Sequence, residues 1–445
     1  MSGSAIHRAI DAVWRIESAK IVATVARMVR EVGLAEELAQ DALVAALERW
    51  PQTGIPANPG AWLTTVAKHS AIDHLRRRKL LARKHEEIGR ELEAELETAA
   101  SFADAMGEAD DIDDDLLRLV FVACHPVLPP EARVALTLRL LGGLTTAEIA
   151  RAFLIPEPTV AQRIVRAKRT LSEARVPFEV PRAEERPARL ESVLAVLYLV
   201  FNEGYAATAG SEWMRPALCE DALRLGRVLA ELMPQEPEVH GLVALMEIQA
   251  SRLRARVGPG GEPILLLDQD RARWDHLLIG RGMAALKRAD ALIADGAPGS
   301  YVLQAGIAAC HAQARSANET DWARIAMLYA LLMKIAPSPV VELNRAVAVG
   351  MANGPNMGPN MGPEAGLAII DALVEQGALA KSHLLPGVRG DLLAKLGRPD
   401  EARREFERAA ALTNNARERK LMQDRARELA GGQASRKLKV VKNER

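Results

Sequence analysis

Apolar residues at helical spacing run through the second half of this chain, and this pattern limits its fold more than any other feature. Leu190, Val193, Leu197 and Phe201 follow one another at intervals of three or four residues, the spacing of one face of an α-helix. Comparable segments continue to about residue 430, separated by stretches rich in Gly and Pro such as 258–261. Aromatic residues make up only 4% of the chain, whereas β-sandwiches and barrels favour aromatic and β-branched residues. We therefore expect an all-α fold.

Charge is balanced over the whole chain but segregated along it. The 58 basic and 58 acidic residues give a formal net charge of +0. Residues 76–84 hold six bases and no acid, residues 104–115 hold seven acids and no base, and residues 163–169 hold four bases and no acid. Any one of these charged runs alone is most simply interpreted as a solvent-exposed helix face or a polar linker. Their order favours two small nucleic-acid-facing domains joined by an acidic connector.

The strongest local pattern lies at 145–171 and predicts a helix-turn-helix. Thr145 and Glu148 fit the capping box of a first helix. A turn at 154–156 follows, and Pro158 falls in the first turn of a second helix, where its missing N–H costs little. The second helix buries Val160, Ile164, Ala167 and Leu171. Its other face can contact base edges and phosphates in a major groove, although a helical hairpin with a basic solvent face is the plain alternative.

Residues 116 to about 175 resemble region 4 of bacterial sigma factors of the extracytoplasmic-function class. The resemblance rests on Ala147–Ala150 in the first helix and Thr159–Lys168 in the second. In that family the second helix reads the −35 promoter element. The resemblance implies −35 contacts by Thr159, Gln162, Arg163, Arg166 and Arg169. The family often has Ser or Gly where this chain has Pro156–Pro158, which leaves the base preference open.

An amphipathic helix from Ala35 to Trp50 resembles sigma region 2.2, which binds the clamp helices of the RNA polymerase β′ subunit. Carboxylates on one helix can pair with Arg on a partner, and apolar side chains add contact area. The resemblance implies that Glu37, Leu38, Gln40 and Asp41 bind core polymerase. Any acidic helix start looks similar, so this motif is weaker than the one at 145–171.

Residues 62–77 resemble sigma regions 2.3 and 2.4, which open the duplex and capture bases of the −10 element. Opening DNA requires pockets for unstacked bases beside a cationic track. The resemblance implies −10 contacts by Trp62, Lys68, His69, Arg76 and Arg77. Core packing is an equal alternative for Trp62, and the family often has Asn where this chain has His69. The preceding loop, 51–60, matches the family's base-capturing loop in position.

The remaining residues resemble the long helical extension of one sigma subfamily. Asn202–Tyr205 and Leu267–Arg271 with Trp274 look like its recurring segments, in which Asp268 or Asp270 reads first as a helix cap. Near the end, Leu396–Ala402 with Phe406, Ala409 and Leu412 resembles a tetratricopeptide helix pair with a Gly-containing turn. A second pair is expected at 325–347, and the duplicated GPNM at 351–363 is expected to be a loop.

Several classes are disfavoured. The three cysteines are far apart and form no CxxC pair, so neither a zinc knuckle nor a disulfide framework is indicated. The N-terminus lacks an apolar core of signal-peptide length, and no apolar run approaches the ~20 residues of a membrane span. A phosphate loop, GxSxG elbow, HExxH motif and dinucleotide fingerprint are all missing from the sequence. We expect a cytoplasmic protein that is not an enzyme and uses no metal or cofactor.

The leading hypothesis is an RNA polymerase sigma factor regulated by its own C-terminal helical domain. Its expected partners are promoter DNA and core polymerase, through the β′ clamp helices and the β flap, with room for a protein or small-molecule partner of the C-terminal domain. Two alternatives are a stand-alone helix-turn-helix regulator with a sensing domain and a peptide-binding scaffold. The predicted parts are a region 2 domain (1–85), an acidic linker (86–115), a region 4 domain (116–176), a linker (177–188), a helical extension (189–290), tetratricopeptide-like repeats (291–430) and a basic tail (431–445).

Overall fold

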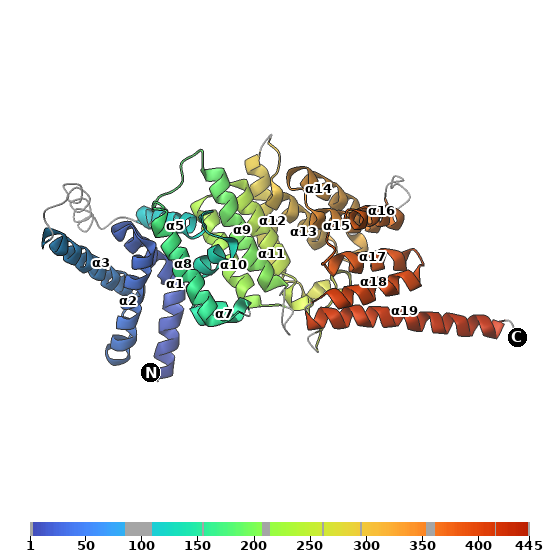
Figure 1. Ribbon diagram of the computed structural model, residues 1–445, viewed down its shortest axis with the longest axis horizontal. Helices are drawn as coiled ribbons and strands as arrows, with labels where there is room; N and C mark the ends of the chain where they lie inside the picture. The colour runs from blue at the N-terminus through green and yellow to red at the C-terminus, as the bar shows by residue number, and fades with distance from the viewer. Residues whose placement is uncertain are drawn as a thin grey trace. The chain divides into compact units, whose positions relative to one another are not determined.

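The computed structural model of the protein is all-α, as the sequence predicts. It describes residues 3–84, 109–153, 155–206, 214–259, 262–293, 296–352, 361–413 and 415–443. Within these ranges no β-strand is formed, and an isolated antiparallel bridge links Val257 and Pro263. The chain divides into two compact units, Met1–Val200 and Phe201–Arg445, whose helices are labelled in Figure 1. Among the described helices, none is both long enough and apolar enough to cross a lipid bilayer.

The first unit contains seven described α-helices and the N-terminal part of an eighth, α9. Its helices are α1 (Gly3–Val29), α2 (Val32–Thr53), α3 (Pro59–Lys84), α5 (Ala109–Ala123), α6 (Pro130–Leu140), α7 (Thr146–Phe153), α8 (Glu157–Glu173) and the N-terminal part of α9 (Arg186–Tyr205). The helices α1, α2 and α3 pack on one another, α5 packs on α1, and α8 packs on α6 and α7. The unit boundary therefore falls inside α9.

The second unit is a succession of helices that pack mainly on their neighbours in sequence. Its α-helices are α10 (Pro216–Leu232), α11 (Pro237–Ala250), α12 (His276–Ile293), α13 (Ser300–Gln313), α14 (Trp322–Ile335), α15 (Pro339–Met351), α16 (Pro363–Glu375), α17 (Leu384–Lys395), α18 (Pro399–Leu412) and α19 (Ala416–Asn443). Short 3-10 turns occur at Leu253–Ala255, Leu266–Asp268, Arg271–Arg273 and Ala317–Glu319.

Both predicted helix pairs of the second unit are present. The pair α14 and α15 covers the segment expected at 325–347, and α17 and α18 flank Gly397, whose φ of 74° suits a residue without a side chain. Phe406 and Ala402 are buried between these helices. The expected GPNM loop lies mostly at 353–360, outside the described residues. Membership of the tetratricopeptide class itself stays a prediction.

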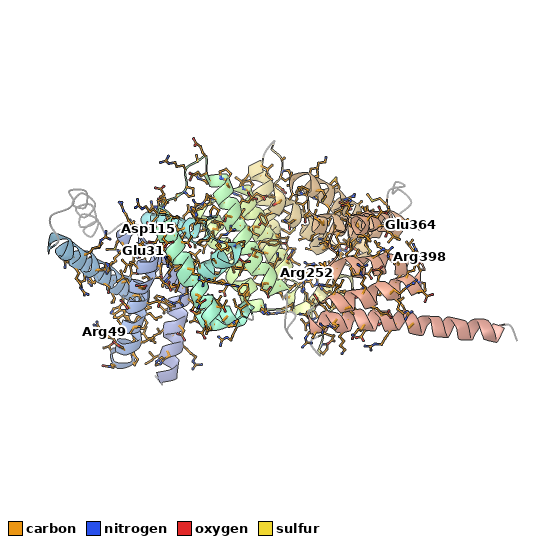
Figure 2. All side chains as sticks on the ribbon, in the orientation of Figure 1. Glu31, Arg49, Asp115, Arg252, Glu364 and Arg398 are labelled. Atoms are coloured by element: carbon orange, nitrogen blue, oxygen red, sulfur yellow. The ribbon has the colours of Figure 1, made fainter. Side chains whose placement is uncertain are left out.

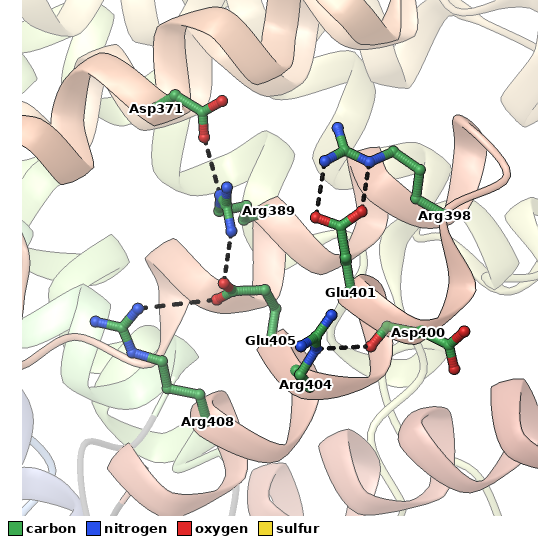
Figure 3. Close-up of polar contacts among 8 residues, drawn as sticks. All are labelled: Asp371, Arg389, Arg398, Asp400, Glu401, Arg404, Glu405 and Arg408. Atoms are coloured by element: carbon green, nitrogen blue, oxygen red, sulfur yellow. Dashed lines mark hydrogen bonds and ion pairs between the residues drawn. The ribbon is translucent and has the colours of Figure 1, made fainter.

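Arg389 ties three successive helices of the second unit together. Its guanidinium contacts the Asp371 carboxylate on α16 at 2.9 Å and the Glu405 carboxylate on α18 at 2.7 Å, while Arg389 itself lies on α17 (Figure 3). Partial burial lowers the pKa of Arg389, but its hydrogen bonds to the two carboxylates outweigh this effect and raise it. This network fixes neighbouring helices more specifically than apolar packing alone.

Three helix boundaries differ from the sequence prediction. The helix expected to stop at Trp50 continues to Thr53 and includes Pro51 in its last turn. Helix α5 begins at Ala109, so the last part of the predicted acidic linker is helical, while 85–108 lie outside the described residues. Helix α19 runs on through most of the predicted basic tail.

Close packing of α15 on α16 predicts a strong effect at Gly366. A Cβ added there would lie 2.7 Å from the carbonyl oxygen of Ala346, a backbone atom that cannot move aside. We expect Gly366→Ala to lower the free energy of unfolding by about 1–3 kcal/mol, the usual cost of overpacking. Gly280→Ala on α12 is the matched control, because a Cβ there meets nothing within 4 Å. The control should be neutral or stabilising by up to about 1 kcal/mol in urea unfolding, and equal behaviour of the two variants would contradict the packing argument.

Candidate nucleic-acid interface and polymerase-binding surface

The capping box predicted at the start of α7 is formed. The Glu148 carboxylate accepts from the Thr145 backbone N–H at 2.8 Å, and the Thr145 hydroxyl accepts from the Glu148 N–H at 3.2 Å. Arg15 of α1 also reaches the Glu148 carboxylate, at 2.5 Å. Burial raises the pKa of Glu148, but the hydrogen bonds from Thr145 and the charge of Arg15 outweigh it and lower that pKa overall. The first helix of the pair is therefore fixed by its own cap and by α1.

Helix α8 has the two faces that the sequence predicts. Its N-terminal Pro158 stands in the first turn, and the four predicted core residues are all buried: Val160, Ile164, Ala167 and Leu171. Of the predicted DNA-contacting residues, Gln162, Arg166 and Arg169 are exposed, whereas Thr159 and Arg163 are half-buried. Arg169 also pairs with Glu173 at 2.6 Å. Exposed surface pairs of this kind are weak, so Arg169 is available to a phosphate.

Helix α2 presents an acidic stripe on its solvent side. Glu31 caps the helix by accepting from the N–H groups of Gly33 and Leu34. Glu37, Asp41 and Glu48 are exposed at helical spacing, together with Val44, which is 51% exposed. Of the residues predicted to bind polymerase, Glu37 and Asp41 lie on this stripe.

The two other predicted polymerase-binding residues point elsewhere. Leu38 is 7% exposed and packs inside the unit. Gln40 is half-buried, and its side-chain amide donates to the Glu36 carboxylate. The exposed apolar side chain of this helix is therefore that of Val44, which the sequence prediction did not select.

Helix α3 carries the predicted −10 residues on an exposed side. His69, Arg76 and Arg77 are exposed, while Trp62 and Lys68 are half-buried. Trp62 lies edge-on to the buried Trp50 of α2, with ring centroids 5.4 Å apart. Trp62 thus packs on the buried Trp50 and is half-buried, while contact of its ring with a base stays a prediction.

A buried carboxylate joins α2 to the helix-turn-helix. Glu36 is 4% exposed. Its Oε1 accepts from the Arg139 Nε of α6 at 2.6 Å, and its Oε2 forms an ion pair with the Lys168 ammonium of α8. Arg139 also donates to the Leu144 carbonyl, in the turn before α7. The end of α8 and the start of α2 are therefore held together by opposite charges within the first unit.

A second buried carboxylate joins α1 to α5. Asp115 (labelled in Figure 2) is 0% exposed and pairs with Arg27 of α1 at 3.1 Å and with Arg118 of α5 at 2.5 Å. Asp115 was predicted to end a solvated acidic linker. It instead belongs to an amphipathic helix whose apolar side covers α1, and only a paired carboxylate is tolerated at such a site.

The N-terminal part of α9 packs on the same bundle. Arg189 donates to the Phe121 carbonyl at 2.8 Å, and the Ser192 hydroxyl donates to the Cys124 carbonyl at 2.6 Å. Arg133 of α6 donates to Ser192 in turn. Burial raises the pKa of the Cys124 thiol to about 11, and burial together with Arg189 lowers the pKa of His125 to about 4. Both side chains are therefore neutral near pH 7.

Glu36, Lys168 and Asp115 received no predicted contact role. A signal for Glu36 does exist, because Ala39, Ala42, Ala46 and Trp50 follow it at helical spacing and are all buried. A carboxylate on such a stripe needs a cation, but the sequence does not say which one. Asp270 was predicted as a cap and is one, accepting from the Ala272 N–H at 3.0 Å, while Asp268 is exposed.

Cys124, Cys219 and Cys310 are buried free thiols. No group of three or more His, Cys, Asp or Glu side chains is arranged to hold a metal ion among the residues that the structure describes.

Three family models match successive segments of the chain. Residues 16–80 match "Sigma-70 region 2", residues 118–171 match "Sigma-70, region 4", and residues 189–290 match "Family of unknown function (DUF6596)". The first match includes α2 and most of α3, and the second includes α7 and most of α8. The third begins in α9 and ends in α12.

Two complete proteins are also similar in sequence to this chain. "Uncharacterized protein R00370" of Rhizobium meliloti is 44% identical over 393 residues, which cover 88% of this chain and 89% of the relative. "Probable ECF RNA polymerase sigma factor SigI" of Mycobacterium tuberculosis is 28% identical over 181 residues, which cover 40% of this chain and 60% of the relative. No solved structure matches the chain.

Proposed function

We propose that this chain, which belongs to the extracytoplasmic-function sigma factors of the sigma-70 family, reads promoters through α3 and α8 and is regulated by its own C-terminal unit. Sigma factor function follows from the two sigma-70 regions and their order.

The outward face of α8 carries the proposal for the −35 element. Gln162, Arg166 and Arg169 are exposed on one side of the second helix of a helix-turn-helix. Arg and Gln are the side chains that make bidentate contacts with guanine and adenine. The buried opposite face fixes the direction in which these three side chains point. We assign to them base and phosphate contacts, with Thr159 and Arg163 at the edge of the same surface.

Helices α2 and α3 carry the remaining contacts. The acidic stripe of Glu37, Asp41 and Glu48, with Val44 inside it, supports binding to a basic helix of core polymerase. On α3, His69 and Arg77 are exposed on the part that follows Trp62. A cationic track beside an aromatic ring suits a melted −10 strand.

The first unit must open in order to read both promoter elements at once. In the sigma factors that this chain resembles, regions 2 and 4 read two separate promoter elements. In the first unit, by contrast, Lys168 of α8 contacts Glu36 of α2. We infer that the packed arrangement is the polymerase-free state, and that the Glu36 and Asp115 ion pairs are exchanged for polymerase and DNA contacts.

Regulation by the second unit is proposed from the continuity of α9. This helix contributes Arg189 and Ser192 to the region 4 bundle and continues to Tyr205. The matched family of unknown function starts at residue 189. The extension thus begins inside the promoter-reading domain, which gives a protein or small-molecule signal in the second unit a physical route to region 4.

Truncations test the role of α9. Ending the chain after Arg175 removes the hydrogen bonds of Arg189 and Ser192 and exposes the surface around the buried Phe121. We expect this truncation to lower the melting temperature of the sigma regions by several degrees, because a loss of about 1 kcal/mol shifts a domain of this size by about 2–4 °C. Ending after Val200 keeps those contacts. Circular dichroism melts compare the two proteins, and equal stability would contradict a structural role of α9 in region 4.

Transcription assays test the function itself. Purified core polymerase with the full chain should initiate at specific promoters, whereas duplex binding without initiation would favour a stand-alone regulator. The truncation after Val200 should change initiation in the same assay. A rise means that the second unit inhibits, a fall means that it supplies a required contact, and an unchanged rate refutes regulation by that unit.

A further inference from the structure

The segment between α11 and α12, residues 251–275, is held by hydrogen bonds within itself, and we call it the excursion. The Asp275 N–H donates to the Ser251 carbonyl at 2.9 Å, which brings its two ends together. The Ile264 N–H donates to the Arg256 carbonyl at 2.8 Å, and the Gln269 side-chain amide donates to the Ile264 carbonyl at 3.1 Å. Side chains of this excursion are thereby held at fixed positions.

Three arginines of this excursion lie near two aromatic rings, those of Tyr205 in α9 and Trp274 in the excursion. The Arg256 guanidinium carbon lies 3.6 Å from the centre of the Tyr205 ring. The same carbon of Arg252 lies 5.8 Å from the Tyr205 and Trp274 ring centres, and that of Arg271 lies 4.8 Å from the Trp274 ring centre. Arg252 and Arg256 are each 8% exposed, and Figure 2 labels Arg252. We call these three arginines with Tyr205 and Trp274 the arginine–aromatic cluster.

Two arginines of this cluster, the buried Arg252 and the half-buried Arg271, carry positive charge without a directly paired carboxylate in the part of the chain that the structure describes. Arg252 and Arg271 form no ion pair with a carboxylate among the described residues. Arg271 donates instead to the neutral carbonyls of His311 and Ala314. The C-terminal end of α11 offers only a partial negative charge of about half an elementary charge. Buried cations without a paired carboxylate are costly and rare. An anion bound beside Arg252 would reduce this cost.

The charges of these arginines shift the pKa values of neighbouring groups. Burial, followed by the charges of Arg252 and Arg271, lowers the pKa of His311 to about 3. Burial and then the charge of Arg252 also lower the pKa of Arg271, and these two effects outweigh the opposing charge of Glu319. The residues around the cluster therefore repel further positive charge and would be stabilised by a negative one.

Several buried polar atoms of the cluster lack a partner. The Nε of Arg252, the Nε1 of Trp274, the Oε1 of Gln269 and the Nδ1 of His311 make no hydrogen bond to any described residue. The side chains of these residues are at least nine-tenths buried, with exposures of 8%, 4%, 8% and 8%. Buried polar atoms are nearly always satisfied. Several unsatisfied atoms in one place indicate a missing polar ligand.

A surface hollow adjoins the cluster through Trp274. The hollow has a volume of about 560 Å³ and is lined by Trp274 together with Arg254, Arg273 and Asp275. Arg254 and Arg273 are exposed, so the rim carries two more positive charges against one carboxylate. Asp275 is already engaged as the cap of α12, accepting from the Leu277 and Leu278 N–H groups. The volume suits a small molecule.

We propose that the excursion between α11 and α12 is a binding site for a small oxyanion-bearing molecule, with a phosphate or carboxylate group held by Arg252 and the Trp274 N–H and the rest of the molecule in the hollow between Arg254 and Arg273. Guanidinium groups match the geometry of both oxyanions. The site goes beyond promoter recognition and gives the second unit a chemical input.

Binding to the full chain tests the site directly. Isothermal titration calorimetry uses inorganic phosphate in one arm and citrate in another, each against sodium chloride at equal ionic strength. We expect saturable binding of at least one of the two, and the arm that binds identifies the oxyanion. The variant Arg254→Ala with Arg273→Ala should weaken this binding at least tenfold while leaving the melting temperature of the free protein unchanged. The matched control is Arg281→Ala with Lys287→Ala, which removes the same charge from exposed positions of α12.

Three results would overturn the proposal. One is the lack of saturable binding of both anions. Another is equal weakening by the rim variant and by the α12 control, which would mean bulk electrostatic attraction. The third is loss of binding in Arg166→Ala with Arg169→Ala, which would place the anion on α8. None of these readouts depends on transcription, so failure here leaves the sigma factor assignment standing.

Discussion

Replacing Glu36 with Ala will lower the free energy of unfolding of the first unit by about 3–5 kcal/mol, the usual cost of breaking a buried ion pair by removing one partner. The cost arises because the substitution leaves two cations, Arg139 and Lys168, without their shared carboxylate. The side chains of Arg139 and Lys168 are only 20% and 19% exposed. Without the carboxylate they would lie close together as two like charges in a poorly hydrated place, or move apart and open the contact between α2 and α8.

The adjacent carboxylate supplies the control. Glu37 is exposed, and Glu37→Ala should change stability by no more than about 0.5 kcal/mol, as is usual for surface positions. Urea unfolding measures both variants, and amide hydrogen exchange shows where Glu36→Ala loosens the chain. We expect faster exchange in α2 and α8. If both variants lose the same free energy, the ion pairs of Glu36 do not hold the unit closed.

The double replacement Arg166→Ala with Arg169→Ala will reduce transcription from a cognate promoter by about 30-fold or more, since each base-contacting arginine is worth about 1–3 kcal/mol. It will also flatten the salt dependence of promoter binding, because each lost phosphate contact lowers the logarithmic slope by about 0.9. Both side chains are exposed, so the fold should be unaffected.

The control for this variant removes equal charge elsewhere. Arg182→Ala with Arg186→Ala changes two exposed arginines outside α7 and α8. It should leave transcription within about twofold, the range expected of a change under about 0.5 kcal/mol. In vitro transcription and gel-shift titration at two salt concentrations measure both variants. An equal loss in the control would mean that α8 contributes only general charge.

The sequence predicts what depends on local spacing. The buried face of α8, the capping box at Thr145 and Glu148, and the helix pair around Gly397 all follow from residues within one or two turns of each other. Their partners are close in sequence, so a period of three or four residues and a known cap are enough to find them.

Contacts between distant segments are beyond this kind of prediction. Glu36 meets Arg139 and Lys168 from more than a hundred positions away, and nothing local selects those cations. Asp115 was therefore read as part of a solvated acidic run, although it is the one carboxylate of that run shown to be buried. The arginine–aromatic cluster is similar, because Arg252 and Arg271 become neighbours only when the excursion folds.

The hydrogen bonds of α9 limit where the C-terminal extension can be exchanged between related proteins during evolution. Because Arg189 and Ser192 complete the bundle that contains α8, the first residues of the extension are inherited with promoter recognition. An exchange of extensions between relatives at the Pro-rich stretch near residue 181 would leave region 4 without part of its own packing. A crossover in the middle of the helix, near Val200, would keep it. Natural chimaeras should therefore join within this helix, and designed biosensors built by domain swapping should be cut there too.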